Sequence, residues 1–149
     1  MPFLVGKNMV AGYGGENILN SCTISVEEGE IAVVVGPNGA GKSTAMKAIF
    51  GMLDLKAGTV LVNGENMRKL KPQERVLKGM GFVPQSKNVF TSMTVEENLE
   101  MGAFIRNDSI NDTMEQVYDL FSVLKEKRFQ VAGELSGGQR QQVAVGRAL

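Results

Sequence analysis

Several residue types are absent or rare in this chain of 149 residues, and each absence narrows the chemistry open to it. There is no histidine, which excludes histidine-based catalytic triads and most zinc sites. The single cysteine, Cys22, cannot form an internal disulfide and is typical of a small buried hydrophobe in a reducing compartment. Basic and acidic residues balance at 16 each, so no excess charge indicates a nucleic-acid partner.

Long apolar stretches are missing as well. The longest purely aliphatic run is "IAVVV" at residues 31–35, far short of the roughly 20 residues that span a membrane. The opening "MPFLVGKNMV" has no long apolar core behind a basic tip, as a signal peptide would have. The length predicts one ordinary domain. Glycine is the one excess, with 18 residues against an average usage of about 7%.

The first half of the chain has the pattern of strands. A short strand is expected at "FLV", residues 3–5, and a half-exposed one in "ILNSCTISVEEGE", residues 18–30, with Ile24 and Val26 on one face. Residues 31–35 are apolar on both faces, as strands inside a parallel sheet are. "MGFVPQ", residues 80–85, predicts another buried strand, ending at Pro84. Between them, Asn63-Gly64 favours a hairpin turn.

Helices dominate the second half. Helices are expected at residues 42–51, from Lys71-Pro72 onward, at residues 94–106 behind a capping box of Thr94 and Glu97, and at residues 111–127. In the last of these, a stripe at helical spacing predicts ordinary core packing: Met114, Val117, Tyr118, Phe121 and Leu124. The change of character near Gln85 predicts an α/β core that carries a helical insertion.

A glycine-rich loop, "GPNGAGKST" at residues 36–44, fits the phosphate-binding pattern G-x-x-x-x-G-K-[ST]. Its glycines let backbone N–H groups turn inward around phosphates, where a Cβ would intrude. The helix expected after the loop directs its positive end at the same charge. Lys42 would reach the outer phosphates, and the Ser43 hydroxyl would bind Mg²⁺. The candidate nucleotide-binding residues of this loop are Gly36, Pro37, Asn38, Gly39, Ala40, Gly41, Lys42, Ser43 and Thr44.

A second motif, "LSGGQ", occupies residues 135–139. Ser136 and Gln139 have the spacing of a capping box, which is a purely structural interpretation. That interpretation places Gly137 and Gly138 in the first helical turn, at a cost of up to roughly 1 kcal/mol each against alanine. Close approach of a phosphate to bare backbone N–H groups explains the two glycines, whereas capping does not.

With both motifs present, the chain resembles the ATP-binding subunit of ABC transporters. The resemblance implies a P-loop NTPase fold of the α/β class. It places an antiparallel β subdomain and a nucleotide-binding core in residues 1–85 and a helical subdomain in residues 86–134. Residues 135–149 would then be the family's signature motif, "LSGGQ", with its helix. It implies ATP and Mg²⁺ as cofactors. It also implies that two such domains pair head to tail, so that Ser136, Gly137, Gly138 and Gln139 act in trans on the ATP of the other subunit.

Two further residues match positions of the family. Tyr13, in "GYGG", matches the aromatic residue that stacks on adenine, an interaction worth about 1–3 kcal/mol by analogy with base stacking. Gln85, in "VPQ", matches the glutamine that contacts Mg²⁺ and the attacking water and senses the membrane subunits. The metal ligands implied in this chain are therefore Ser43 and Gln85.

The segment "LKPQERVLKGMGFVPQSKNVFTSMTVEENLEMGAFIR", residues 70–106, is similar to the subfamily that serves branched-chain amino acid importers. An ATPase of lipopolysaccharide export or of another ABC system is the alternative. The partners implied are a second ABC ATPase subunit, transmembrane permease subunits and, indirectly, a solute-binding protein. The location implied is cytoplasmic, at the inner face of the cell membrane. ABC-type ATPases that act on DNA carry long coiled coils between the two motifs, and no heptad run lies between Ser43 and Leu135.

The chain closes on "QVAVGRAL", an apolar helix pattern without a stop signal, which predicts a buried terminal helix. In the family, the pattern continues into a strand ending in Asp-Glu, a D-loop and a switch histidine. None of these is present here. We therefore expect the front part of a longer protein, incomplete at its C-terminus and without catalytic residues of its own. A naturally short, non-hydrolysing nucleotide-binding module is the alternative.

Overall fold

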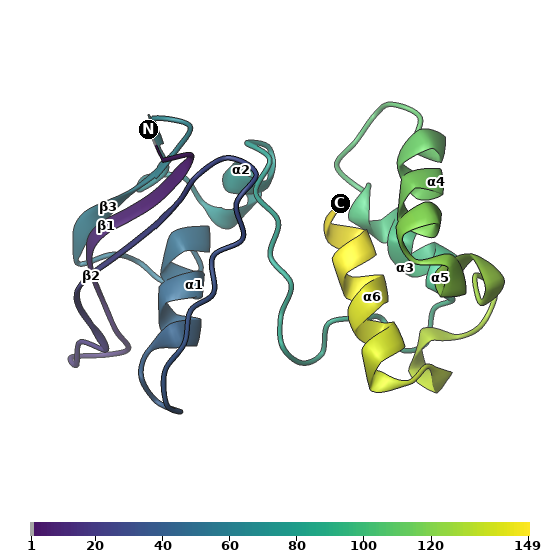
Figure 1. Ribbon diagram of the computed structural model, residues 1–149, viewed down its shortest axis with the longest axis horizontal. Coiled ribbons are helices and arrows are strands. Elements are labelled where there is room, and N and C mark those ends of the chain that lie inside the picture. Colours follow the sequence, from purple (N-terminus) through teal and green to yellow (C-terminus); the bar gives the residue numbers. More distant parts are fainter. Residues whose placement is uncertain (1) are drawn as a thin grey trace. The chain divides into compact units, whose positions relative to one another are not determined.

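The computed structural model describes residues 2–149 and divides them into two compact units (Figure 1). The first unit extends to Met80, and the second is Gly81–Leu149. Helices in the described residues are too short or too polar to cross a membrane.

The first unit contains a four-stranded sheet and two helices. Its elements are β1 (Leu4–Ala11), β2 (Leu19–Val26), α1 (Lys42–Phe50), β3 (Ala57–Val62), β4 (Glu65–Asn66) and α2 (Pro72–Val76). The strand order is β2-β1-β3-β4, and every neighbouring pair is antiparallel. Asn63 and Gly64 both have positive φ and form the tight turn between β3 and β4, which confirms the predicted hairpin.

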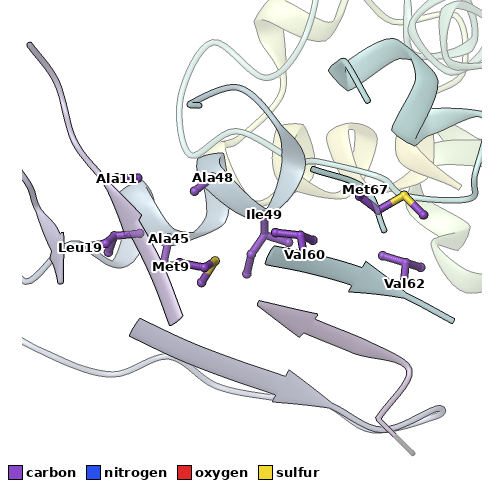
Figure 2. Packing of buried hydrophobic residues seen from close by; sticks show 9 residues of the cluster. All are labelled: Met9, Ala11, Leu19, Ala45, Ala48, Ile49, Val60, Val62 and Met67. Atoms are coloured by element: carbon purple, nitrogen blue, oxygen red, sulfur yellow. The ribbon is translucent and has the colours of Figure 1, made fainter. Parts of the chain in front are cut away.

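Helix α1 packs against one face of this sheet (Figure 2). Small and branched residues of the helix meet apolar side chains of three strands, and the contact excludes water from all of them. The buried residues of this cluster are Met9, Ala11, Leu19, Ala45, Ala48, Ile49, Val60, Val62 and Met67. Ile24, on the predicted inward face of β2, is half-buried against the same cluster. The helix that follows the glycine-rich loop is therefore held in place by the sheet.

The C-terminal end of α1 is capped by a buried arginine from α2. Arg75 is 3% exposed, and its guanidinium donates to the carbonyl oxygens of Leu70, Ala48 and Ile49. Burial lowers the pKa of this guanidinium, and nearby Asp54 partly opposes the effect. A cation at this position also suits the negative end of the helix dipole. Gly51 has φ +83°, and a Cβ there would meet the guanidinium at 2.7 Å, so glycine is required.

Two predicted strands are not formed, which corrects the expectation from the sequence. Residues 31–35 have no strand partner among the described residues, and Ile31, Val33 and Val35 are 90%, 76% and 83% exposed. Residues 80–85 are likewise irregular. An apolar run becomes a strand only where a neighbour satisfies its backbone groups, and the antiparallel sheet provides no neighbour for either segment. The sheet of this chain is thus wholly antiparallel.

The second unit is helical. Its elements are α3 (Val95–Gly102), α4 (Asn111–Leu120), α5 (Ser122–Glu126), the 3-10 turn η1 (Ala132–Glu134) and α6 (Gly137–Ala148). They enclose a second core of Val95, Leu99, Val117, Tyr118, Leu124, Ala132, Leu135 and Val143. Met114 and Phe121 pack against this core, so the predicted stripe at residues 114–124 is confirmed as core packing.

Helix α3 begins as predicted and ends earlier than predicted. The Thr94 hydroxyl accepts from Glu97 N–H at 3.2 Å, and Thr94 N–H donates to the Glu97 carboxylate at 2.7 Å. Thr94 donates to this carboxylate from its N–H and also from its hydroxyl, at 2.9 Å, and these two hydrogen bonds hold the pKa of the Glu97 carboxyl below its usual value. The helix stops at Gly102 rather than near Arg106. A Cβ on Gly102 would lie 2.2 Å from the backbone oxygen of Arg147, so the close approach of α6 requires glycine there.

The helix expected at residues 111–127 is broken at Phe121, whose φ of −130° and ψ of 75° are not helical. The break separates α4 from α5 while Phe121 stays packed against the core. The terminal helix is also less buried than predicted. Val143 and Ala144 are buried, but Ala148 is exposed and Leu149 is 66% exposed.

Candidate functional site

The glycine-rich loop between the exposed segment 31–35 and α1 is built on left-handed backbone positions. Gly39 has φ +85° and Gly41 has φ +90°, conformations that only glycine adopts without strain. The turn from Pro37 to Ala40 is closed by Ala40 N–H donating to Pro37 O at 3.2 Å. All residues from Gly36 to Ala40 are exposed, so the loop is accessible to a ligand. The local sequence therefore produces an exposed loop with two left-handed glycines.

Lys42 closes this loop from within. Its ammonium donates to the backbone oxygens of Gly36 at 2.6 Å and Pro37 at 2.8 Å. These two carbonyls hold the ammonium beside the exposed residues 36–40, so the loop carries one fixed positive charge. A phosphate group is the kind of anion that such a lysine binds.

The first turn of α1 adds further donors. Gly41 is the N-cap and offers no side-chain cap, and the first turn contains no acidic residue. The first intrahelical hydrogen bond runs from Ala45 N–H to Gly41 O, so the preceding N–H groups have no acceptor within the helix. Ser43 is exposed at this end, whereas the Thr44 side chain is 6% exposed and leaves mainly its backbone N–H available.

Tyr13 lies on the loop between β1 and β2, in the same unit as the glycine-rich loop. The loop is closed by Ile18 N–H donating to Ala11 O at 2.9 Å. The Ile18 side chain lies beside Gly41, because a Cβ on that glycine would be 3.1 Å from Ile18 Cγ2. Tyr13 is 51% exposed, and the ammonium of Lys47 lies 5.9 Å from its ring centroid. Ile18 thus brings the end of this loop beside the N-cap of α1, while the Tyr13 ring lies near Lys47 in the last turn of the same helix.

The second motif forms the start of α6 in unit 2. Ser136 Oγ accepts from Gln139 N–H at 3.3 Å, and Ser136 N–H donates to Gln139 Oε1 at 3.2 Å, so the capping box is present. Gly137 and Gly138 have no positive φ, and a Cβ at either would meet no atom within 4 Å. Neither backbone conformation nor packing against residues 2–149 requires these two glycines.

Gln85 is an exposed residue of the irregular segment at the start of unit 2. Three residues further on, the Asn88 side-chain amide donates to Gln141 Oε1 of α6 at 2.7 Å. Asn88 is 8% exposed, so this hydrogen bond is a firm link between the segment after Gln85 and the helix that carries the second motif.

Within residues 2–149, no three side chains of His, Cys, Asp or Glu gather into a possible metal site. The groups that fit Mg²⁺ by their chemistry are the exposed Ser43 hydroxyl and the Gln85 amide oxygen, because Mg²⁺ prefers oxygen ligands and completes its shell with substrate phosphates. Ser43 lies in unit 1 and Gln85 in unit 2.

Several contacting residues of the site were not predicted from the sequence. Ile18, Lys47, Asn88 and Gln141 each contact a segment far away in the chain. Lys47 alone had a local signal, since a basic residue in the last turn of a helix is common. That signal explains its presence and does not indicate the contact with Tyr13.

Comparison with known proteins bears on these motifs. A family model described as "ABC transporter" matches residues 19–149. The probable branched-chain amino acid transport ATP-binding protein LivF of Archaeoglobus fulgidus is 39% identical over 140 residues, which cover 93% of this chain and 59% of LivF. The lipopolysaccharide export system ATP-binding protein LptB of Escherichia coli K12 is 30% identical over 157 residues, covering the whole chain and 63% of LptB. The chain therefore spans about three fifths of the length of these curated relatives.

The fold also matches a solved structure. A nucleotide-free ATP-binding cassette from an ABC transporter superposes with a TM-score of 0.83 at 31% identity, covering 100% of this chain and 65% of that one. The predicted fold class, an α/β P-loop fold of the ABC ATPase type, is confirmed by this match.

Proposed function

Because the chain belongs to the ABC transporter family, we propose that it acts as an ATP-binding subunit that couples ATP binding and hydrolysis to solute transport. The observation that carries this proposal is the phosphate loop. Its left-handed glycines, its exposed residues 36–40 and the ammonium of Lys42 beside them support the binding of a polyphosphate.

Each site residue has a role in this proposal. The backbone N–H groups of residues 38–44 and the Lys42 ammonium hold the phosphates, while Tyr13 stacks on the base. The Ser43 hydroxyl and the Gln85 amide oxygen would hold Mg²⁺, which would supply positive charge to the phosphoryl group being transferred. The signature, residues 136–139, faces the nucleotide of a second subunit, and the absence of any use for Gly137 and Gly138 within their own chain supports this.

The proposed partners are a second ABC ATPase subunit, permease subunits in the membrane and, through them, a solute-binding protein. The subunit would then lie on the cytoplasmic face of the membrane. We propose branched-chain amino acids as the solute because the similarity to LivF, at 39% identity, exceeds that to LptB, at 30%. Lipopolysaccharide export is the second candidate, supported by the match of LptB to the whole chain.

Nucleotide binding is tested by the substitution Lys42→Ala. Removing a charge-assisted contact with phosphate should weaken ATP binding by about ten- to a hundredfold, because hydrogen bonds to charged groups are worth about 1.5–3 kcal/mol. Isothermal titration calorimetry of the purified 149-residue chain with Mg-ATP gives the affinities. Lys7→Ala removes an exposed lysine of β1 in the same unit and is the matched control. Unchanged affinity in Lys42→Ala would contradict the assignment of the loop.

The solute class is tested by assembly. The chain is expressed together with permease subunits of a branched-chain amino acid importer or, separately, of a lipopolysaccharide exporter. Co-purification with the first set alone supports the import proposal, and co-purification with the second set alone supports export.

A further inference from the structure

Tyr13 is held by two lysines that approach its loop from different elements. Lys56 donates to Gly15 O at 3.3 Å and to Asn17 Oδ1 at 2.8 Å, which anchors the backbone of the loop. Lys47, on α1, instead places its ammonium 5.9 Å from the centroid of the Tyr13 ring. This distance is within the range at which a cation is attracted to the negative face of an aromatic ring.

The ring contact is the one specific interaction of the Lys47 ammonium among the described residues, since no carboxylate of residues 2–149 lies within ion-pair distance of it. Lys47 is half-buried on a helix that packs against the sheet, so its Cα is fixed. Tyr13 is 51% exposed and sits on a surface loop. The fixed partner is therefore the lysine, and the residue whose orientation is restricted is the tyrosine.

The position of Lys47 on α1 links this contact to the phosphate loop, which precedes the same helix. Lys42 of the same helix closes the phosphate loop, and Lys47 lies near the other end of the helix. One rigid helix thus fixes both the phosphate-binding loop and, through the cation–π contact, the exposed aromatic ring. A ring with an ammonium over one face keeps its other face for a planar base.

We propose that Lys47 is a positioning residue for base recognition: it orients the Tyr13 ring so that the base of a nucleotide stacks on the face opposite the ammonium. The inference rests on the proposed function. Lys47 makes no contact with phosphate in this proposal, and its whole effect passes through Tyr13.

The test compares two ligands that share phosphates and differ in the base. ATP and inorganic tripolyphosphate, each with excess Mg²⁺, are titrated into the 149-residue chain and into Lys47→Met, which keeps the side-chain length and removes the charge. We expect Lys47→Met to weaken ATP by about two- to fivefold, the size of an exposed cation–π contact, and to leave tripolyphosphate affinity unchanged. Lys47→Arg, which retains the cation, should restore ATP affinity. Lys7→Met is the control for the loss of one positive charge in unit 1.

A double-mutant cycle isolates the pathway. In the Tyr13→Ala background, Lys47→Met should have no further effect on ATP affinity, because the ring through which the lysine acts is gone. An equal loss of tripolyphosphate binding, or a loss of ATP affinity that persists without Tyr13, would overturn the inference and assign Lys47 a general electrostatic or structural role. If the unmodified chain bound neither ligand, the proposed function would fail and this inference with it. ATP binding that Lys42→Ala weakens and Lys47→Met does not would refute the inference alone.

Discussion

Asn98 shows how one buried polar residue organises the helical unit. It lies in α3 with 0% of its surface exposed, yet each of its polar atoms has a partner. Its Oδ1 accepts from Phe90 N–H at 2.7 Å, and its Nδ2 donates to the carbonyl oxygens of Phe90 and Thr94, both at 2.9 Å. One amide therefore satisfies both the donor and the acceptor of Phe90 and ties the loop before α3 to the helix.

Replacing this amide should be costly. Asn98→Leu leaves the Phe90 N–H without its acceptor, while the carbonyls of Phe90 and Thr94 keep only their backbone donors, Met93 N–H and Asn98 N–H. We expect a loss of about 1–3 kcal/mol in the free energy of unfolding. Asn98→Asp preserves the shape but turns the donor into a carboxylate oxygen facing two carbonyls, which raises the pKa of the introduced group. Its destabilisation should be greatest at neutral pH and should diminish as the pH falls below that raised pKa, where the acid donates a proton.

Urea unfolding followed by far-UV circular dichroism at pH 7 and pH 4.5 measures both effects, and hydrogen exchange at the amides of α3 localises them. Asn20→Asp, an exposed asparagine of β2, is the matched control and should change the unfolding free energy by less than about 0.5 kcal/mol. An Asn98→Asp variant as stable as the unmodified chain at pH 7 would show that the side-chain hydrogen bonds of Asn98 contribute little to the free energy of unfolding.

At the scale of elements, the segments that were predicted correctly are those whose signals are local. The capping boxes at Thr94 and Ser136 and the hairpin turn at Asn63-Gly64 form as expected, because every partner lies within four residues. The segments predicted wrongly depend on distant partners. Residues 31–35 and 80–85 have strand composition, but a strand exists only through its neighbours, and the described residues supply none. The need for glycine at position 102, in the last turn of α3, likewise comes from a backbone oxygen 45 residues away, at Arg147.

Three glycines of α6 provide a contrast between helix stability and function. Gly137 and Gly138 have open space where a Cβ would be, whereas a Cβ on Gly146 would lie 2.7 Å from Val117 Cγ1 and 2.9 Å from Leu99 Cδ2. Gly137→Ala or Gly138→Ala should therefore stabilise the second unit, by up to about 1 kcal/mol each, because alanine has the higher helix propensity. Gly146→Ala should destabilise it by about 1–3 kcal/mol through overpacking. Urea unfolding monitored by circular dichroism distinguishes the two directions.

The same alanines should harm function while they stabilise the fold. If Gly137 and Gly138 are kept so that a phosphate of the opposing subunit can approach bare backbone, an added Cβ should reduce nucleotide-dependent dimerisation of the chain. Size-exclusion chromatography with light scattering, with and without ATP, provides the measurement. More stable variants that dimerise as well as the unmodified chain would remove the functional reason for these glycines.

At the scale of the whole molecule, the sequence predicts the two motifs of the candidate site but not the long-range contacts that hold these motifs in place. The phosphate loop and the signature are continuous motifs, so their residues and their backbone conformations follow from local glycine patterns. The contacts that hold them are of another kind: Arg75 on the end of α1, Ile18 beside Gly41, and Asn88 bound to Gln141. These pairs join segments far apart in the chain, and no periodicity within either segment identifies its partner.

The residues of the candidate site are better suited to binding a nucleotide than to hydrolysing it. The groups that the chain offers to a nucleotide are backbone N–H donors, an ammonium, a hydroxyl and an amide, all of which hold phosphates or a metal. Within residues 2–149, no three side chains of His, Cys, Asp or Glu gather where they could position Mg²⁺ and an attacking water. Electrostatic positioning is the main contribution to phosphoryl transfer, so these residues by themselves should give almost no rate.

We therefore expect the purified 149-residue chain to bind Mg-ATP and to release phosphate no faster than its Lys42→Ala variant. The variant is the matched control, because a contaminating ATPase contributes equally to both preparations whereas turnover by the chain itself requires the loop. The measurement is a continuous phosphate-release assay. It is run at protein concentrations from well below to well above the concentration at which any ATP-dependent dimer forms, so it also tests whether pairing of two copies gives ATPase activity. Phosphate release that rises with the square of protein concentration and disappears in Lys42→Ala would contradict this expectation, because the residues on this chain would then be sufficient for hydrolysis. Gln85 would in that case be the residue that orients the water.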